Sequence, residues 1–231
     1  MSAGLSRLIR DELLQLEGVR RHAPTRRAMT LFASDTAADS VFFVESGYVK
    51  TIKRSGDGKE VLVSIVGPGQ IFGEQALYVG GQRGMWAEVM QEGVVYEVPR
   101  DMFLQFCESH PEVWRHLSEA LVQRQRELEQ KISLLCLNDV ESRILHYLGS
   151  LSSTFGINAV NGQEYALPLS QSELASLIGA TRETTSTTLN ALARRGLIRL
   201  GRRLLIVNSA DAVRSAVRDR VAKAAHQAQG A

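Results

Sequence analysis

The spacing of apolar and polar positions changes along the chain and divides it into three regions. Between residues 28 and 100, short strand-like apolar runs are punctuated by glycines. These runs are residues 41–47, 48–54, 61–66 and 94–98. Their length and spacing predict the strands of a β-barrel or sandwich. The glycine-rich residues 55–59 lie between two of the runs and predict a hairpin turn with antiparallel pairing.

One long helix is predicted over residues 111–137, because Pro111 suits a first helical turn and no glycine follows within the segment. Apolar residues recur every seven positions and form a narrow seam, which is typical of a two-stranded contact between subunits. The residues expected at this contact are Leu117, Leu121, Leu128, Ile132 and Leu135. Arg124 and Lys131 occupy the other core-type positions and should weaken the seam. A helix packed wholly within one subunit is the alternative.

Two short helices around a tight turn are predicted in the third region, between Ser170 and Gly196. Ser170 followed three residues later by Glu173 is a capping-box pattern and predicts the start of the first helix. Gly179 ends this helix, Thr181 can cap the second, and Gly196 follows at the position of a C-terminal cap. This arrangement is typical of a helix-turn-helix.

The second of these helices has an apolar and a polar side. Thr185, Leu189 and Leu192 are spaced four and three residues apart, so they predict the buried side. The polar side projects from the start of the helix, where a recognition helix meets base edges in the major groove. The candidate DNA-binding residues there are Thr181, Arg182, Glu183, Ser186, Thr187 and Asn190.

Positive charge is concentrated at the C-terminal end. The whole chain has a formal net charge of +2, whereas residues 180–231 hold ten Lys or Arg against three acidic residues. A basic end on an otherwise mildly acidic chain suits contact with phosphates and release of counterions. Alone, such an end is more often a solvated surface. Together with the helix-turn-helix, it favours double-stranded DNA as the partner.

Length and composition suit two soluble domains, with 231 residues of which 44% are hydrophobic. No run approaches the ~18 to 20 apolar residues that span a bilayer, and residues 1–7 lack the apolar run of a secretory signal. We therefore expect a cytoplasmic chain without a membrane partner. Cys107 and Cys136 lie far apart without close Cys or His residues, so neither a disulfide framework nor a metal site is expected.

No enzymatic signature is found, and no catalytic residue is predicted. The glycines at 67, 69 and 73 have the wrong spacing for a dinucleotide fingerprint. The sequence has no phosphate-loop lysine signature and no nucleophile elbow. Glu74 and Arg83 are interpreted as a binding pair rather than as catalytic groups.

Residues 67–77, Gly-Pro-Gly-Gln-Ile-Phe-Gly-Glu-Gln-Ala-Leu, resemble the phosphate-binding cassette of cyclic-nucleotide-binding domains, and Arg83 follows at the right distance. With the long helix, the helix-turn-helix and the hairpin-like run 197–207, the chain resembles the CRP/FNR family of bacterial transcription regulators over about residues 28–210. This family is named after the cyclic AMP receptor protein and the fumarate-nitrate reductase regulator. The resemblance implies an α+β fold with a β-barrel (jelly roll), a long helix and a winged helix-turn-helix.

The resemblance also implies three parts and their roles. These are an effector domain at 1–110, a dimerisation helix at 111–137 and a winged helix-turn-helix at 138–217. The alanine- and glutamine-rich composition of residues 218–231 predicts a basic, disordered tail. Two subunits are expected to dimerise and to place their recognition helices in successive major grooves of a near-palindromic operator. The last hairpin, with Arg202 and Arg203, would form a wing over the DNA backbone. RNA polymerase is the further expected partner.

The head of the recognition helix matches the family's arginine-glutamate pair. By this match, Arg182 is expected to bond a guanine edge and Glu183 to accept from a cytosine amino group. Thr187 stands where the family has a third base-contacting arginine. Threonine is too short to form two hydrogen bonds to guanine, but it can contact a thymine methyl group. The operator should therefore differ from the family's operators at that base pair.

The effector cassette matches the family in part. Gly73, Glu74 and Arg83 match residues that would approach a ribose phosphate, accept from a ribose hydroxyl and neutralise a cyclic phosphate. Gly84 stands where the family's nucleotide binders carry a small hydroxyl or alanine residue, and Gln82 replaces the usual proline. No cofactor is certain, and a cyclic nucleotide is the candidate.

The long helix disfavours cyclic AMP. Leu128 and Glu129 stand where cyclic AMP receptors use threonine and serine hydroxyls to bond adenine. Leucine cannot form such a bond, whereas a carboxylate could accept from guanine donors. Cyclic GMP or cyclic di-GMP, another small effector, or no effector at all stay open. The expected function is a DNA-binding regulator that is ligand-independent or controlled by an effector other than cyclic AMP. The alternative is a nucleotide-sensing module that acts through a protein partner.

Overall fold

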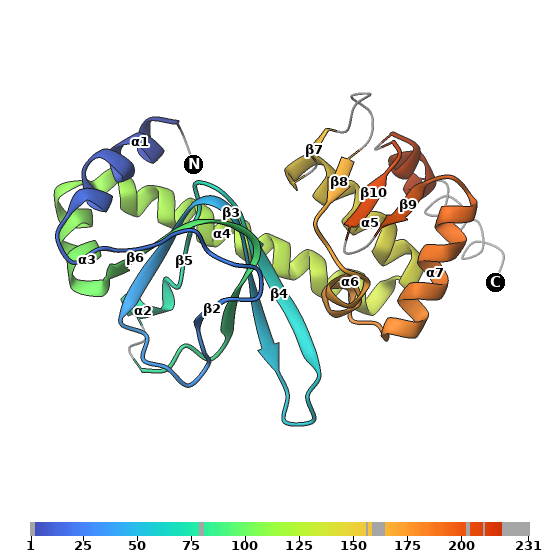
Figure 1. Ribbon diagram of the computed structural model, residues 1–231, viewed down its shortest axis with the longest axis horizontal. Helices are drawn as coiled ribbons and strands as arrows, with labels where there is room; N and C mark the ends of the chain where they lie inside the picture. The colour runs from blue at the N-terminus through green and yellow to red at the C-terminus, as the bar shows by residue number, and fades with distance from the viewer. Residues whose placement is uncertain are drawn as a thin grey trace. The chain divides into compact units, whose positions relative to one another are not determined.

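The computed structural model describes residues 3–78, 81–155, 157–158, 165–201, 204–209 and 211–218. The chain forms two compact units, Met1–Leu128 and Glu129–Ala231 (Figure 1). Within the described residues, no helix combines the length and the apolar character needed to cross a membrane. The predicted change from strands to a long helix and then to short helices is confirmed by the order of the elements.

The first unit is built around an antiparallel sheet of six strands. Its strand order is β1-β6-β3-β4, with β2 paired to β6 and β5 paired to β3. The strands are β1 (Arg20–His22), β2 (Thr30–Phe32), β3 (Ser40–Arg54), β4 (Glu60–Val66), β5 (Ile71–Phe72) and β6 (Trp86–Pro99). The helical elements are α1 (Ala3–Asp11), the 3-10 helix η1 (Leu13–Gln15), α2 (Gln75–Tyr78), α3 (Arg100–Ser109) and α4 (Pro111–Leu137).

The two runs expected on either side of Gly47 form one continuous strand, β3, which pairs with β6 along its length. The pairing register shifts near Gly47, where the backbone takes φ +79°. A Cβ at Gly47 would lie 2.6 Å from the carbonyl oxygen of Gln91 on β6, so only glycine fits. Gly47 is therefore a β-bulge rather than a strand end. The predicted hairpin turn at residues 55–59 is confirmed between β3 and β4.

Among the described residues, two apolar clusters lie in the core of the first unit. The first packs α1, η1, α3 and the start of α4 against the sheet and includes Val113 and Leu117 of α4. The second is enclosed by the strands and includes three aromatic rings, those of Phe32, Phe42 and Phe72. Phe42 and Phe72 stack at 5.1 Å between ring centroids.

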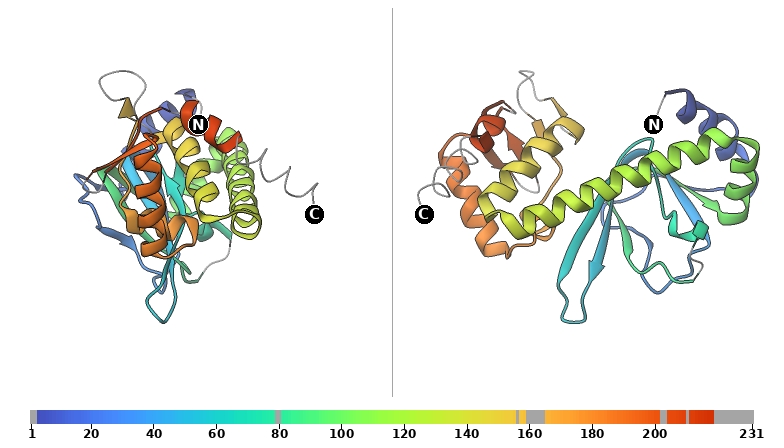
Figure 2. Two further views of the ribbon diagram at one scale, coloured as in Figure 1. Left: turned by 90° about the vertical axis from the view of Figure 1, so that its right-hand side faces the viewer. Right: turned by 180° about the vertical axis from the view of Figure 1, so that it is seen from behind.

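Side-chain exposure along α4 differs from the prediction for part of the apolar seam between subunits. Leu117 is only 2% exposed and belongs to the core of its own unit, so it is not available for a contact between subunits. Leu121 is partly buried against the same cluster. Leu128, Ile132 and Leu135 remain 44%, 61% and 40% exposed. Figure 2 shows α4 as one continuous helix.

The second unit combines helices with a small antiparallel sheet of order β7-β8-β10-β9. Its strands are β7 (Ile157–Asn158), β8 (Tyr165–Leu167), β9 (Ile198–Gly201) and β10 (Leu204–Val207). Its helices are α5 (Val140–Phe155), α6 (Gln171–Ile178) and α7 (Arg182–Arg194). A further helical segment covers residues 211–218. Fully buried side chains of α5, α6 and α7 meet in the core, among them Ile144, Leu148, Leu174, Leu189 and Leu192.

Candidate DNA interface and effector cassette

The predicted capping box at the start of α6 is formed as expected. The Ser170 hydroxyl accepts from the Glu173 backbone N–H at 3.2 Å, and the Glu173 carboxylate accepts from the Ser170 backbone N–H at 2.9 Å. Gly179 ends the helix in the left-handed conformation, with φ +63°. These local interactions fix both ends of α6 and so set the turn that leads into α7.

Threonine hydroxyls at the start of α7 are used within the helix itself. Thr181 caps it by accepting from the Thr184 backbone N–H at 3.1 Å. The Thr185 hydroxyl donates to the Thr181 carbonyl, and the Thr188 hydroxyl donates to the Thr184 carbonyl, each at 2.8 Å. Thr185 is fully buried, as predicted. The hydroxyl hydrogens of Thr185 and Thr188 are therefore engaged in the helix rather than offered to a partner.

The remaining polar side chains of α7 are presented to solvent. Arg182, Glu183, Thr187 and Asn190 are exposed, and Ser186 is half-buried. The helix thus carries a mixed set of hydrogen-bond donors and acceptors on the side away from its buried Leu189 and Leu192. Base edges are read by such donors and acceptors. Arg202 and Arg203, expected in the wing, lie outside the described residues.

Two arginines hold the helix-turn-helix against α5. Arg143 of α5 donates from Nη1 to the Ile178 carbonyl at 2.7 Å, at the end of α6. Arg195, directly after α7, donates to the Glu141 carboxylate at 2.7 Å. The turn before α7 and the residue after α7 are therefore both anchored to α5, which fixes the direction in which α7 presents its polar side.

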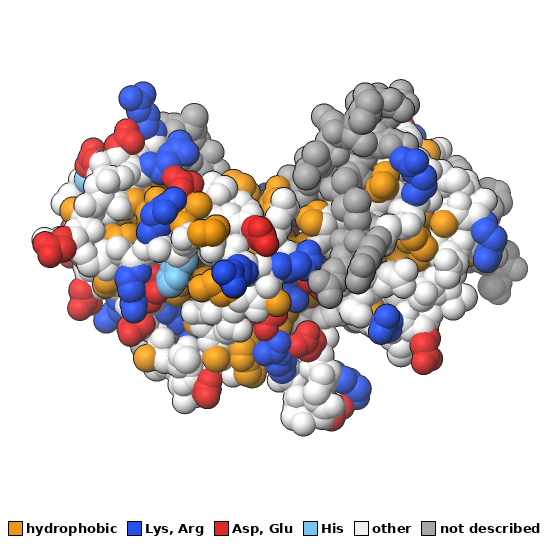
Figure 3. Space-filling view, in the orientation of Figure 1, with side chains coloured by type: hydrophobic (Ala, Val, Ile, Leu, Met, Phe, Trp, Pro, Cys, Tyr) orange, Lys and Arg blue, Asp and Glu red, His pale blue; other side chains and the backbone are white. Residues whose placement is uncertain are grey.

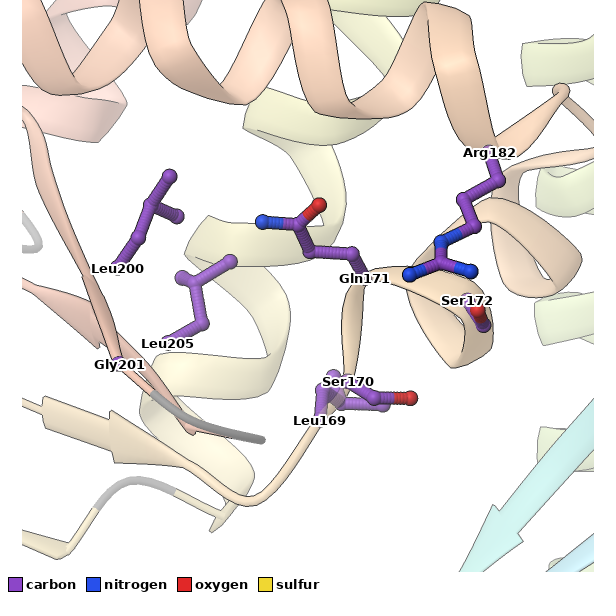
Figure 4. Close-up of a pocket in the computed structure, with 8 residues that line it drawn as sticks. All are labelled: Leu169, Ser170, Gln171, Ser172, Arg182, Leu200, Gly201 and Leu205. Atoms are coloured by element: carbon purple, nitrogen blue, oxygen red, sulfur yellow. The ribbon is translucent and has the colours of Figure 1, made fainter.

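A hollow of about 460 Å³ lies between the start of α6, the head of α7 and the strands β9 and β10 (Figure 4). Arg182 and polar side chains of α6 line one end, and leucines line the other. The lining residues are Leu169, Ser170, Gln171, Ser172, Arg182, Leu200, Gly201 and Leu205. Gln171 and Ser172 were not predicted as site residues, and their signal was their place in the first turn of a helix. On the face shown in Figure 3, the second unit presents more basic than acidic side chains.

The cassette arginine is inside the first unit. Arg83 is 2% exposed, donates from Nη2 to the Ser40 hydroxyl at 2.9 Å and from Nη1 to the Gly73 carbonyl at 3.2 Å. Its guanidinium carbon lies 4.6 Å from the ring centroid of Phe32 and 5.4 Å from that of Phe42. Among the described residues, the buried Nε has no hydrogen-bond partner, a loss of about 1–3 kcal/mol that contacts with the rings partly offset.

The Ser40 hydroxyl connects Arg83 to a carboxylate by hydrogen bonds. The Ser40 hydroxyl lies 3.1 Å from a Glu97 carboxylate oxygen, and Glu97 also pairs with Arg20 at 2.6 Å and His22 at 3.0 Å. Burial lowers the pKa of the Arg83 guanidinium, while the charges of Asp39 and Glu97 act in the opposite direction. Ser40 and Glu97 had no signal in the sequence because β-strand pairing alone brings them beside the cassette.

The cassette glutamate is bound by α4. Glu74 accepts from Nη1 of Arg124, whose Nη2 donates to the Ile71 carbonyl. Arg124 is therefore tied to its own cassette and half-buried, at 23% side-chain exposure, and Lys131 is buried, at 8% exposure. The expectation that these two residues weaken the seam between subunits stays a prediction.

The other two candidate effector residues are exposed. Gly84 has φ +66° and donates its backbone N–H to the Ser34 carbonyl at 2.9 Å. Glu129 is exposed on α4 and belongs to the second unit. Within the described residues, no group of three or more His, Cys, Asp or Glu side chains is placed to hold a metal ion.

Both units match known families. Residues 25–110 match a cyclic nucleotide-binding domain, and residues 142–215 match a Crp-like helix-turn-helix domain. A CRP-like cAMP-activated global transcriptional regulator from Mycobacterium tuberculosis is 33% identical over 191 residues, which cover 82% of this chain and 85% of the relative. The chain belongs to the CRP/FNR family of transcription regulators.

Solved CRP/FNR structures have the same fold. A transcriptional regulator of the CRP family from Thermus thermophilus aligns with a TM-score of 0.72 at 25% identity, covering 86% of this chain and 96% of its own. The c-di-GMP responsive global regulator CLP from Xanthomonas campestris aligns with a TM-score of 0.76 at 24% identity, covering 90% and 100%. As a CRP/FNR regulator, this chain binds DNA through the helix-turn-helix of its second unit.

Proposed function

We propose that this CRP/FNR regulator is a homodimer that recognises a near-palindromic operator through α7. The observation that carries the proposal is the exposed polar side of α7, with Arg182 and Glu183 at its head and the hydroxyls of Thr185 and Thr188 engaged inside the helix. An arginine can bond guanine bidentately and a glutamate can accept from cytosine, each worth about 1–3 kcal/mol of discrimination. Arg202 and Arg203 add phosphate contacts.

The exposed stripe on α4 supports the dimer. Leu128, Ile132 and Leu135 are spaced four and three residues apart, which is the heptad spacing of a two-stranded coiled coil. The stripe extends toward Gln125 and the partly buried Leu121, so it runs along one line of the helix. Dimerisation sets two α7 helices at a fixed separation, and only ~34–36 Å matches successive major grooves.

The parts of the chain keep the roles that the sequence suggested. Residues 1–110 form the effector domain, 111–137 the dimerisation helix, 138–217 the DNA-binding domain and 218–231 a basic tail. RNA polymerase is a partner of the DNA-bound dimer. DNA binding is either independent of a ligand or controlled by an effector other than cyclic AMP, since Leu128 and Glu129 replace the hydroxyls that would bond adenine. The effector of the Mycobacterium tuberculosis relative is therefore not carried over to this chain.

A selection of duplexes from a random pool tests this function. The full-length protein is incubated with the pool at fixed salt, without nucleotide and with cyclic AMP, cyclic GMP or cyclic di-GMP in separate arms. An enriched inverted repeat with half-site centres about 10–10.5 base pairs apart, or a multiple of that, is expected. If no sequence is enriched in any arm, the proposed operator recognition is wrong and a module that acts through a protein partner replaces it.

A further inference from the structure

The guanidinium of Arg83 is covered on nearly every side by protein atoms. A cyclic phosphate binds such a group through its N–H edges, and each terminal nitrogen already donates to an acceptor of this chain, Ser40 or Gly73. Phe32 lies over the face of the group at 4.6 Å. The guanidinium has five N–H groups, so these two bonds leave three, and the one at Nε has no hydrogen-bond partner among the described residues. Because Arg83 is 2% exposed, an acceptor could reach these three only if protein atoms moved.

The space beside Gly73 is also filled. A glycine in a phosphate cradle leaves room for a ligand where a Cβ would otherwise lie. Here, a Cβ built at Gly73 would lie 3.0 Å from Nη1 of Arg83 and 3.2 Å from the ring of Phe42. The room that the glycine leaves is therefore occupied by the arginine and an aromatic ring of the same chain.

The charge of Arg83 is balanced within the first unit. Ser40 connects it to Glu97, and the carboxylate of Asp39 lies 3.8 Å from Nη2. A bound cyclic phosphate would add a further negative charge beside these two carboxylates, which disfavours it. The second cassette group is engaged as well, because Glu74 is paired with Arg124 instead of being open to a ribose hydroxyl.

The residues of the cassette thus do not fit the nucleotide that the family implies. We propose that this cassette is closed by its own side chains, so that Arg83 is an internal cation of the barrel rather than a phosphate anchor, and operator binding needs no cyclic nucleotide. The statement about operator binding rests on the proposed function. The statement about the cassette stands on the contacts of Arg83, Ser40 and Glu74 alone.

Nucleotide titration of the full-length protein tests the closed cassette directly. Cyclic AMP, cyclic GMP and cyclic di-GMP are titrated in a calorimeter, and the melting temperature is recorded with each at about 1 mM. No binding heat and no rise in melting temperature are expected, while the same preparation binds its selected operator without nucleotide. Saturable binding of any of the three with a Kd below about 100 μM would overturn the proposal. Failure to bind DNA would count against the proposed function only.

The Arg83→Gln substitution distinguishes between two roles of Arg83, an internal cation and a phosphate anchor. As an internal cation, its loss leaves Ser40 and Gly73 without their donor, so the melting temperature should fall by about 5 °C or more, with operator affinity within twofold of the parent. Arg100→Gln is the matched control, because Arg100 is 44% exposed and should leave the melting temperature unchanged. An unchanged melting temperature in Arg83→Gln would contradict the proposal.

Ser40→Ala tests the contacts of Arg83 independently, in case the Arg83→Gln protein does not fold. It removes one acceptor of Arg83 and the connection to Glu97, while the cation stays in place. The melting temperature should fall by about 2–4 °C without a change in operator affinity and without gain of a nucleotide response. A Ser40→Ala protein as stable as the parent would overturn the role of Ser40 in holding Arg83.

Discussion

Glu74 and Arg124 form an ion pair between the effector cassette and α4, across 50 positions of the sequence. Their side chains are 17% and 23% exposed, so water screens the pair only in part. Arg124 also donates to the Ile71 carbonyl, so it is a polar contact through which α4 holds the cassette loop.

Arg124→Met should therefore lower the free energy of unfolding by about 1–2 kcal/mol, as expected for a partly buried hydrogen-bonded charge. Urea unfolding measures the change. Gln123→Met is the control, because Gln123 is exposed and its side chain donates to Glu127 on the same helix. Combined with Glu74→Gln, the Arg124 substitution should cost less than the sum of the two single changes; strictly additive costs would show that the pair is not coupled.

Arg182→Ala should weaken operator binding by about 1–3 kcal/mol and relax the preference for guanine at one base pair of each half-site. Fluorescence anisotropy with the selected operator and with single-base variants measures both effects. Glu183→Ala should relax a different base pair, at cytosine. Equal losses on every sequence would identify Arg182 as a phosphate contact instead, and an unchanged base preference in Glu183→Ala would show that Glu183 does not read a base.

Thr187 and Thr188 form a matched pair of neighbouring threonines. Thr187 is exposed, whereas the Thr188 hydroxyl donates to the Thr184 carbonyl within α7. Thr187→Ala should therefore change the enriched base at one operator position by about 1 kcal/mol, and Thr188→Ala should not. Repeating the duplex selection with each variant compares them. A changed preference in Thr188→Ala alone would mean that α7 faces DNA with another side.

Ile132→Glu should separate the subunits, because this side chain is 61% exposed and lies at the centre of the stripe on α4. Sedimentation velocity should give a dimer for the parent and a monomer for the variant, with unchanged circular dichroism. Val122→Glu is the matched control, since Val122 is 50% exposed but lies off the stripe. A dimer that survives Ile132→Glu would contradict the assigned face of α4.

Lys131 should make stability depend on pH. Burial lowers the pKa of its ammonium group to about 8 from 10.5, so the unfolded chain binds more protons than the folded one between these two values. The free energy of unfolding should rise with pH through this window by up to about 3 kcal/mol.

Lys131→Met removes this titration. The stability gained by the variant over the parent should be largest below about pH 8 and should shrink toward pH 10.5. Urea unfolding at pH 7, 8, 9 and 10 measures the difference, and Lys53→Met, at an exposed position, is the control. A difference that stays constant with pH would show that Lys131 is not buried as a charge.

Local interactions could be predicted from the sequence because both partners lie within one turn of each other. The capping box of Ser170 and Glu173, the stop at Gly179 and the buried side of α7 were all predicted, and each depends on residues three or four positions apart. The change of period also separated the strands from the long helix. Gly47 was misjudged as a strand boundary, because a bulge and a turn both require glycine and differ only in what lies opposite.

The tertiary structure decided which sides of the elements are covered. The seven-residue period of α4 was visible in the sequence, but the apolar positions of Leu117 and Ile132 look alike until the first unit buries one and leaves the other exposed. Glu74 and Arg83 were recognised as a binding pair, yet their partners come from Arg124 and Ser40, 50 and 43 positions away. The sequence determines which chemical groups are present and which short-range contacts form. Only the folded chain determines whether those groups face a ligand or each other, because that depends on contacts between distant segments that no local pattern encodes.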